Sequence, residues 1–264
     1  CFYKETLDLK DPGEQSLQQF DKTTREIGPV LWYALGGGEP FLRSDLPDIH
    51  RLIMQNCQPL MVSIPTNGWY TDKTYIRTLQ MLQQMQRGSL TVQISVDGPA
   101  ALHDAIRGEH SWQHLLKTWH NLNELQLLYQ RLSLGIITVV NDTNHHVYPA
   151  FIAELVDTFQ PNQLSVNLVR DTANLAARPS AAVLDAYKDA IERYEWHMQH
   201  KTLTAFSYLG GAIVRAKEAV QKHLIYRVMR FDEFVTPCTA GALTYVIWED
   251  GRLNACEMLP DTVG

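Results

Sequence analysis

Three consecutive glycines followed by a glutamate are the residues of this chain best suited to hold a ligand. The tripeptide Gly36–Gly38 follows the apolar run 30–35 and precedes Glu39 and Pro40. Because glycine has no Cβ, such a loop lets backbone N–H and C=O groups approach a ligand closely. The glutamate adds a fixed acceptor for a cation. The same pattern is also typical of an ordinary turn between a strand and a helix, so the loop alone predicts no particular ligand.

Three further apolar runs also end in polar residues that could contact a ligand. In chain order these residues are Asn67 after the run 59–64, Asp97 after the run 90–96 and Asn141 after the run 134–140. Functional groups at the carboxyl ends of successive parallel strands are where α/β barrels and open α/β sheets place their sites. We therefore expect the glycine loop and these strand ends to form one site.

Two of the cysteines flank a stretch with the pattern of a β-hairpin. Residues 244–256 alternate around Asp250 and Gly251, and Cys238 and Cys256 lie on either side of this turn. A hairpin would bring both thiols to neighbouring positions, which suits metal binding. A disulfide is the competing interpretation, but the chain shows no secretory segment, and intracellular cysteines more often serve metal or redox chemistry. Cys57 has no partner at ligand spacing and is interpreted as a small buried hydrophobe.

The elements that position these residues alternate between strand and helix, which indicates the α/β class. Strands are expected near 30–35, 59–64, 90–96, 133–140 and 163–169, and helices near 46–56, 72–86, 111–129, 145–159 and 180–200. Thr71 is predicted to cap the second helix, Gly88 to end it, and Pro179-Ser180 to open the last. Such alternation indicates parallel strands joined by right-handed crossovers. From about residue 200 a helical stretch leads into the hairpin.

Composition is that of a globular protein with one large domain and a small appendage. The 264 residues are 45% hydrophobic and 20% charged, with a net charge of −6. This balance offers no basic surface for nucleic acid, and no apolar run approaches the roughly 20 residues that a membrane span needs. We expect a cytoplasmic protein that binds neither nucleic acid nor membrane.

Several motifs, taken together, resemble one enzyme family. Gly36–Pro40 resembles the glycine-glycine-glutamate-proline motif of radical S-adenosylmethionine (SAM) enzymes. Ser95–Pro99 followed by His103–Gly108 is similar to a stretch found in members that carry extra iron–sulfur clusters, and Val139–Asn144 fits the same subgroup. The resemblance implies a partial (β/α)6 barrel in which the five strands are the second to sixth. The first strand would then precede Cys1.

The family signature is a set of three cysteines that binds three irons of a 4Fe–4S cluster and leaves the fourth iron open for SAM. By this resemblance Cys1 would be the third ligand, and the other two would lie upstream of it. The alternative is that Cys1 is only an accident of where the sequence begins.

The resemblance also implies roles for the residues at the strand ends. We expect the SAM-binding residues to be Gly37, Gly38, Glu39, Pro40, Asn67, Ser95, Asp97 and Asn141. The glycine loop and Glu39 would hold the methionyl amine, Ser95 and Asp97 the methionyl carboxylate or ribose, and Asn141 the ribose or adenine. Each also has a structural interpretation, as a strand serine bonded to a neighbouring carbonyl, a turn aspartate or a loop cap. No catalytic acid or base is identified.

Two groups near these motifs are open to more than one interpretation. Arg107 either reaches a carboxylate in the site or pairs with Asp104 one helical turn away. The adjacent His145 and His146 point in different directions on a helix, so a solvated helix start is favoured over a metal pair.

The cysteine hairpin resembles the opening of the SPASM or twitch domain, which holds an auxiliary iron–sulfur cluster. On this basis Cys238 and Cys256 would be metal ligands, with the remaining ligands after Gly264. The expected domains are the partial barrel over 1–200, a helical bridge over 201–236 and the start of the auxiliary domain over 237–264.

The resemblance implies reductive cleavage of SAM to a 5′-deoxyadenosyl radical, which abstracts hydrogen from a substrate. The expected cofactors are a SAM-binding 4Fe–4S cluster, SAM and an auxiliary iron–sulfur cluster, and the electron donor would be a flavodoxin or ferredoxin. Members with this architecture often modify peptides or proteins, which is the first expectation for the substrate. The alternatives are a small molecule such as a nucleotide, sugar or cofactor precursor, or a non-catalytic binding protein that lacks the cluster.

Overall fold

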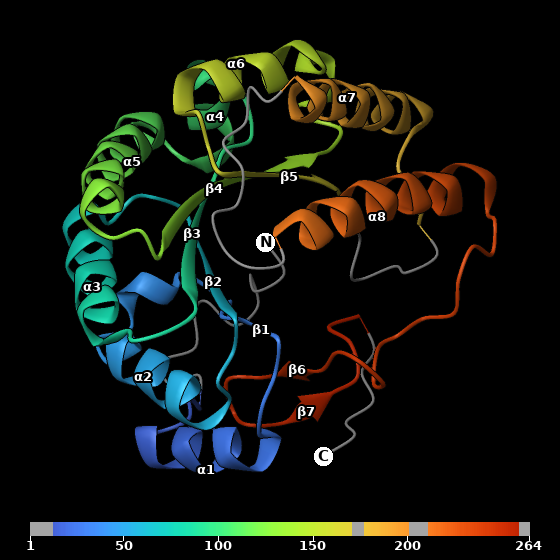
Figure 1. Cartoon of the computed structure of the whole chain (residues 1–264). Helices are drawn as coiled ribbons and strands as arrows, with labels where there is room; N and C mark the ends of the chain where they lie inside the picture. The colour runs from blue at the N-terminus through green and yellow to red at the C-terminus, as the bar shows by residue number, and fades with distance from the viewer. Residues whose placement is uncertain (1–12, 171–176, 201–210, 259–264) are drawn as a thin grey trace.

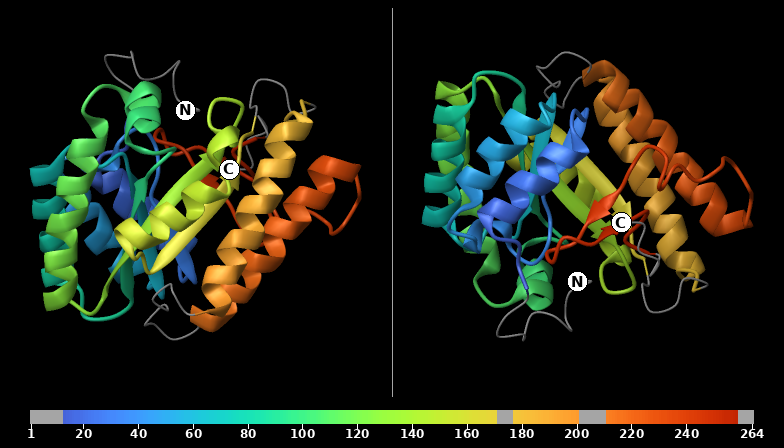
Figure 2. Two further views of the ribbon diagram at one scale, coloured as in Figure 1. Left: turned by 90° about the horizontal axis from the view of Figure 1, so that it is seen from above. Right: turned by 90° about the horizontal axis from the view of Figure 1, so that it is seen from below.

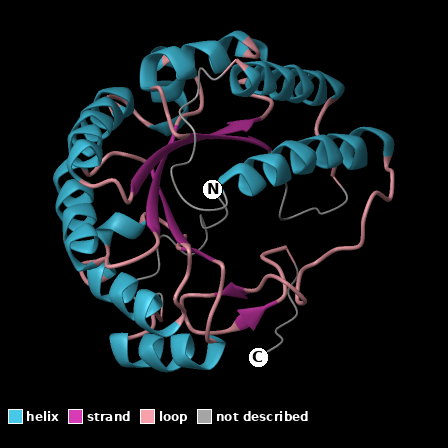
Figure 3. Ribbon diagram, in the orientation of Figure 1, coloured by secondary structure: helices cyan, strands magenta, loops and turns pink. Residues whose placement is uncertain are grey.

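Five parallel strands in sequence order form a sheet that curls into an open half-barrel (Figure 1, Figure 3). The computed structural model describes residues 13–170, 177–200 and 211–258. The strands are β1 (Trp32–Ala34), β2 (Met61–Thr66), β3 (Ser89–Ser95), β4 (Leu132–Val140) and β5 (Gln163–Leu168). The predicted α/β partial barrel is confirmed, and all five strands lie where the apolar runs predicted them.

Helices cover the convex face of the sheet, and the last of them lies across its open side (Figure 1). Their bounds are α1 (Leu17–Ile27), α2 (Leu46–Asn56), α3 (Thr71–Gln84), α4 (Ala100–Arg107), α5 (Ser111–Leu128), α6 (Ala150–Phe159), α7 (Ala181–Gln199) and α8 (Gly211–Phe231). Two short 3-10 helices span Pro40–Leu42 and His145–Val147. The helix predicted over 145–159 is therefore wrong at its start, because the extended Tyr148 and its cis bond to Pro149 separate the 3-10 turn from α6. The ring planes of His145 and His146 are perpendicular.

The predicted helix ends are only partly correct. Ser180 caps α7, since its side chain accepts a hydrogen bond from the Val183 N–H. Thr71 is the first residue of α3 rather than its cap, and its hydroxyl lies 2.8 Å from that of Thr118 on α5. Helix α3 ends at Gln84, so Gly88, with φ of +70°, belongs to the turn that follows.

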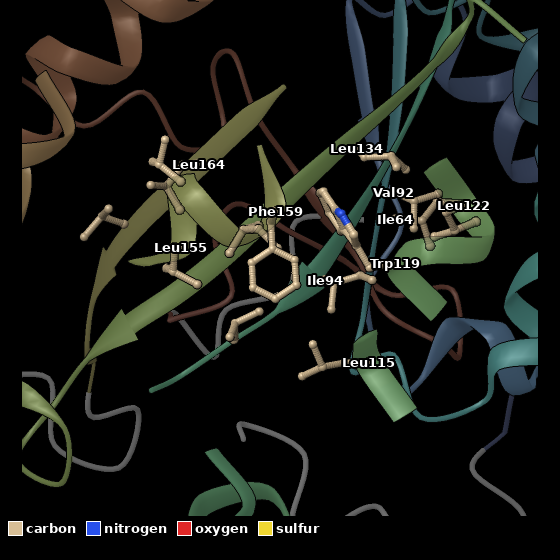
Figure 4. Packing of buried hydrophobic residues seen from close by; sticks show 14 of the residues in the cluster. Ile64, Val92, Ile94, Leu115, Trp119, Leu122, Leu134, Leu155, Phe159 and Leu164 are labelled. Carbon is tan, nitrogen blue, oxygen red and sulfur yellow. The ribbon is translucent and has the colours of Figure 1, made fainter. Parts of the chain in front are cut away.

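The main core lies between the convex face of the sheet and the helices. Strand side chains alternate between the two faces, and those on the convex face are almost all apolar. Ile64, Val92 and Ile94 are fully buried there beside Leu115 and Leu122 of α5 (Figure 4). Cys57 belongs to this cluster, where its thiol donates to the Thr24 carbonyl. This burial confirms its interpretation as a small buried hydrophobe, and it raises the pKa of the thiol to about 11.

The concave face is polar by comparison. The register places on this face Trp32, Ala34, Met61, Ser63, Pro65, Ser89, Thr91, Gln93, Ser95, Ser133, Gly135, Ile137, Val139, Gln163, Ser165 and Asn167. None of these positions in the five strands carries a charged residue. The sheet therefore separates an apolar core under the helices from a concave face whose strand side chains are uncharged and mostly polar.

Helix α8 lies across the open side of the half-barrel, beside α7 (Figure 1, Figure 2). Two consecutive residues of α8 reach opposite edges of the sheet. The Lys217 ammonium lies 5.6 Å from the centre of the Trp32 ring on β1. The Glu218 carboxylate accepts a 2.7 Å hydrogen bond from Gln163 on β5. The helix thus bridges the gap between the first and last strands.

The predicted C-terminal hairpin is present. Strands β6 (Val246–Ile247) and β7 (Leu253–Asn254) pair antiparallel, and Gly251 in the turn has φ of +93°. The hairpin contacts the segment before α1, where the Gln15 N–H donates to the Glu249 carbonyl at 2.7 Å. No helix in the described part of the chain is long and apolar enough to cross a membrane.

Candidate functional site

The predicted site residues lie at one edge of the sheet, because all five strands are parallel and their carboxyl ends share that edge. Contacts between successive loops confirm that they lie together. Glu39, in the loop after β1, accepts a hydrogen bond from the N–H of Asn67, in the loop after β2. Asp97, in the loop after β3, accepts a hydrogen bond from the N–H of Val139, near the end of β4. Burial raises the pKa of Glu39, and the Arg107 charge offsets a small part of this rise, so the two pairs are within electrostatic range of each other.

The glycine loop presents bare backbone to open space. Gly36, Gly37 and Gly38 are all exposed. A Cβ added at Gly36 or Gly37 would meet no atom within 4 Å, and Gly37 has φ of +118°, a conformation that L side chains rarely adopt. The loop therefore fits a ligand that approaches the main chain itself, as the methionyl end of SAM would.

The Glu39 carboxylate holds two loops together, which differs from its expected role as an acceptor for the ligand. One oxygen accepts from the Asn67 N–H at 2.8 Å, and the other accepts from the Thr66 hydroxyl at 2.8 Å and the Phe41 N–H at 3.3 Å. Burial raises the pKa of Glu39, and these hydrogen bonds lower it in part. Glu39 thus positions the neighbouring loops with most of its hydrogen-bonding capacity already used.

Asn67 forms an Asx turn at the end of β2, because its side-chain oxygen accepts from the Trp69 N–H at 2.8 Å. The next residue, Gly68, has φ of +75° and packs against α5, where an added Cβ would lie 2.9 Å from the Leu115 Cβ. The Trp69 ring stacks on that of His114 with centroids 4.4 Å apart. The loop after β2 is consequently fixed by α5 on one side and by Glu39 on the other.

Asp97 is buried and paired with Arg107. Its Oδ2 accepts from the Arg107 Nε at 2.7 Å, and its Oδ1 accepts from the Val139 N–H at 3.3 Å. Of the two interpretations left open for Arg107, the structure shows the first: it reaches a carboxylate in the site, that of Asp97, and does not pair with Asp104. Asp104 instead accepts from the Trp112 N–H and the Ser111 hydroxyl, and so fixes the start of α5.

His103 on α4 holds the loop that carries Asp97 in place. Its Nδ1 accepts from the Asp97 N–H at 3.3 Å, and the side chain is fully buried. Burial, assisted by the Arg107 charge, lowers the pKa of His103 to about 4. The imidazole is therefore neutral at pH 7, as its acceptor role requires.

Ser95 is available to a ligand. It is the last residue of β3, half-buried on the concave face, and its hydroxyl has no hydrogen-bond partner among residues 13–170, 177–200 and 211–258. The alternative interpretation, a hydroxyl bonded to a neighbouring carbonyl, does not hold.

Asn141 acts as a loop cap, and a neighbour makes the longer-range contacts. The Asn141 side-chain oxygen accepts from the Thr143 N–H at 2.8 Å. The fully buried Asn144 donates from Nδ2 to the carbonyls of Asp97 and Val139, each at 2.8 Å. Sequence reasoning included Asn144 in the motif but not in the site. The feature that could have identified Asn144 is its position in the same loop, three residues after Asn141.

The cysteines fit a metal site only in part. Cys1 lies outside the described residues. Cys238 is exposed and Cys256 half-buried, both are free thiols, and the competing disulfide is absent. The chain segments that follow Cys238 and precede Cys256 come close, since a Cβ added at Gly241 would lie 3.2 Å from that of Ala255. Within the described part of the chain no three cysteine, histidine or acidic side chains gather as a metal site would require, so these two thiols alone do not hold a cluster.

Comparison with known proteins agrees with this architecture. Residues 1–155 match the family model described as the radical SAM superfamily. The fold is similar to that of native anSMEcpe with bound AdoMet (SAM), with a TM-score of 0.63, 14% identity and coverage of 100% of this chain and 72% of that one. It is also similar to native anSMEcpe with bound AdoMet and Cp18Cys peptide, with a TM-score of 0.58, 13% identity and coverage of 98% and 70%. No curated protein sequence matches the chain significantly.

Proposed function

Because the chain belongs to the radical SAM superfamily, we propose that it binds SAM at the carboxyl ends of β1 to β4 and cleaves it reductively as part of an enzyme. The observation that carries this proposal is the exposed glycine loop Gly36–Gly38 at the edge where the strand ends meet, where a Cβ added at Gly36 or Gly37 would stand in open space. A 4Fe–4S cluster with Cys1 among its ligands would supply the electron that converts SAM to methionine and a 5′-deoxyadenosyl radical for hydrogen abstraction.

The chain's own residues bind and orient SAM in this proposal. The glycine loop takes the methionyl end through its main chain, and the free Ser95 hydroxyl offers a hydrogen bond from the concave side. Asp97 and Arg107 neutralise each other, so they define the shape of the site without adding net charge. Glu39 and Asn144 fix the loops in advance, which reduces the entropy lost on binding.

Calorimetric titration of the chain with SAM tests the binding step. We expect Gly38→Val to abolish binding, because its side chain would stand where the ligand meets the backbone, and to leave the thermal unfolding midpoint almost unchanged. Unchanged SAM affinity in a folded Gly38→Val variant would remove the central assignment.

The cleavage step needs a protein that includes the two cysteines expected before Cys1. After anaerobic reconstitution and reduction, this protein should release 5′-deoxyadenosine, and Cys1→Ala should release none. If the reconstituted protein binds SAM and holds a reducible cluster but forms no 5′-deoxyadenosine, the chain is a SAM-binding module rather than part of an enzyme.

A peptide or protein is the substrate class that we propose, with a flavodoxin or ferredoxin as electron donor and an auxiliary cluster at the C-terminal hairpin. Support comes from the hairpin with its two free thiols and from the peptide complexes of anSMEcpe, whose fold the chain shares. Mixed short peptides should stimulate 5′-deoxyadenosine formation more than nucleosides or sugars at equal concentration. Stimulation by nucleosides or sugars alone would favour a small-molecule enzyme.

A further inference from the structure

The concave face carries a layer of carboxamide side chains just below the proposed SAM site. The strand register aligns Gln93 of β3 with Gly135 of β4, and Gly135 with Gln163 of β5. Ser95 lies two residues further along β3, which is a separation of roughly 7 Å. A group bound in the lumen beneath SAM would therefore meet this layer first.

Gly135 leaves room for the two glutamine side chains to pack beside it. A Cβ added there would lie 3.1 Å from the Gln93 Cγ and 3.4 Å from the Gln163 Cβ. The residue has no left-handed backbone conformation that requires glycine, so its role is steric. Any larger residue at this position would displace one of the two glutamine side chains.

Helix α8 adds two charged side chains beside this layer, and several of their polar atoms lack partners. Gln163 Nε2 donates to Glu218 Oε1 at 2.7 Å. The buried atoms Gln163 Oε1, Glu218 Oε2 and Lys222 Nζ have no hydrogen-bond partner within the described ranges. Gln163 and Lys222 are each only 6% exposed. An unpartnered buried polar atom costs about 1–3 kcal/mol, so three of them around one point indicate a ligand site.

The charges of Glu218 and Lys222 beside the carboxamide layer offset each other. Lys222 Nζ lies 3.9 Å from Glu218 Oε2, within ion-pair range but too far for a hydrogen bond, and 4.1 Å from the centre of the Tyr194 ring. Because the concave strand positions carry no charge, the site is neutral overall. It offers two acceptors, from Gln163 and Glu218, and one donor, from Lys222. A carboxamide has the complementary set of N–H donors and a carbonyl acceptor.

We propose that Gln93, Gly135, Gln163, Glu218 and Lys222 form a carboxamide-binding site for the substrate. The ligand group is a peptide unit or the side-chain amide of asparagine or glutamine. This inference rests on the proposed function and narrows its substrate class to molecules that carry an amide.

Nuclear magnetic resonance of the 264-residue chain, labelled with ¹⁵N at glutamine side chains, tests the proposal. The probes are N-acetylglycinamide and, for comparison, sodium acetate at equal ionic strength. The Gln163 side-chain signal is assigned by its loss in Gln163→Met, and by through-bond correlations if that variant does not fold. We expect a saturable shift of this signal with N-acetylglycinamide and none with acetate.

Two variants define how the probe binds. Lys222→Met removes the donor and should weaken binding of N-acetylglycinamide about fivefold, which corresponds to the loss of one hydrogen bond of about 1 kcal/mol. Gln80→Met, on the exposed outer face of α3, should leave binding unchanged.

The proposal is overturned if the Gln163 signal does not move, if acetate moves it equally, or if all glutamine signals shift alike. The titration involves neither SAM nor a cluster. Its failure would therefore leave the proposed function standing, and a failure of SAM binding would not affect its outcome.

Discussion

At the scale of single residues, the buried carboxylates of the site are used to fix its loops. Glu39 accepts a hydrogen bond from the loop after β2. Asp97 forms an ion pair with Arg107 and accepts a hydrogen bond from β4. Both are predicted from the sequence to contact the ligand. An acidic residue at a strand end looks the same in the sequence whether its carboxylate points to a ligand or to a neighbouring loop. The partner of Glu39 lies 28 positions away at Asn67, and no local pattern predicts that contact.

The bonds of Glu39 lead to a first prediction. Glu39→Ala should lower the free energy of unfolding by about 1–3 kcal/mol, because the Asn67 N–H loses its acceptor. It should also weaken SAM binding, since the loop is no longer fixed. Glu39→Gln should be milder because one acceptor oxygen remains. Urea unfolding and calorimetric titration measure both effects, and an Ala variant as stable as the parent would show that water replaces the carboxylate without cost.

A buried histidine gives a prediction about pH. Both ring nitrogens of His50 on α2 lack partners among the described residues, and burial lowers its pKa to about 4 from the ordinary 6.5. Between these values the unfolded chain binds a proton that the folded chain excludes, so stability falls as the pH falls from 6.5 towards 4. His50→Leu should make this fall shallower.

The measurement for His50 is the urea midpoint at pH 7 and pH 5. His120→Leu is the control, because His120 is an exposed residue of α5 and its loss should leave the slope unchanged. His103 keeps part of the slope in both variants, since its pKa is also lowered to about 4. An unchanged slope in His50→Leu would contradict a neutral buried imidazole.

The loops that follow the strands contain glycines with different roles, although the sequence alone does not distinguish them. Gly68→Ala should cost several kcal/mol, because φ of +75° disfavours a side chain and the new Cβ would meet the Leu115 Cβ at 2.9 Å. Gly36→Ala should leave stability within about 0.5 kcal/mol, as at an ordinary surface position. Chemical denaturation of the two variants compares them directly, and similar losses would show that the loop after β2 adjusts to the added methyl group.

The sequence predicted the strands well and two helices not at all. Each strand has a continuous apolar run on its convex face, and this signal is strong. Helix α1 is mostly polar, with only Thr24 fully buried, so it has no apolar run, although Leu17, Phe20 and Ile27 recur on the face that packs against the core. The capping box of Ser16 and Gln19 was the signal that could have located it. Helix α4 is only eight residues long, and His103 is its one buried residue.

At the scale of the whole molecule, the two cysteine positions are expected to have separate functions. In a reconstituted protein with its upstream cysteines, Cys256→Ala should lower the iron content and product formation, and should spare some 5′-deoxyadenosine release. Cys1→Ala should stop that release altogether. Iron analysis and chromatography of the nucleoside products distinguish the two. Equal loss of 5′-deoxyadenosine in both variants, with the SAM-binding cluster intact by electron paramagnetic resonance, would show that the cysteines serve one site.

The closing helix could not be predicted from local patterns. The contacts of Lys217 with Trp32 and of Glu218 with Gln163 join residues far apart in the sequence, and neither pair has a distinctive motif. The helical pattern of this stretch is clear in the sequence, but no local pattern indicates that the helix lies across the lumen.

The half-barrel is held together in two different ways. In a closed barrel, the number of strands and their stagger set the circumference, and every neighbour is held by backbone hydrogen bonds. Between the described strands β1 and β5, the side chains of Lys217 and Glu218 on α8 make the contacts instead. Substitutions at these two positions would therefore change how α8 is held against the sheet without breaking a backbone hydrogen bond of the sheet.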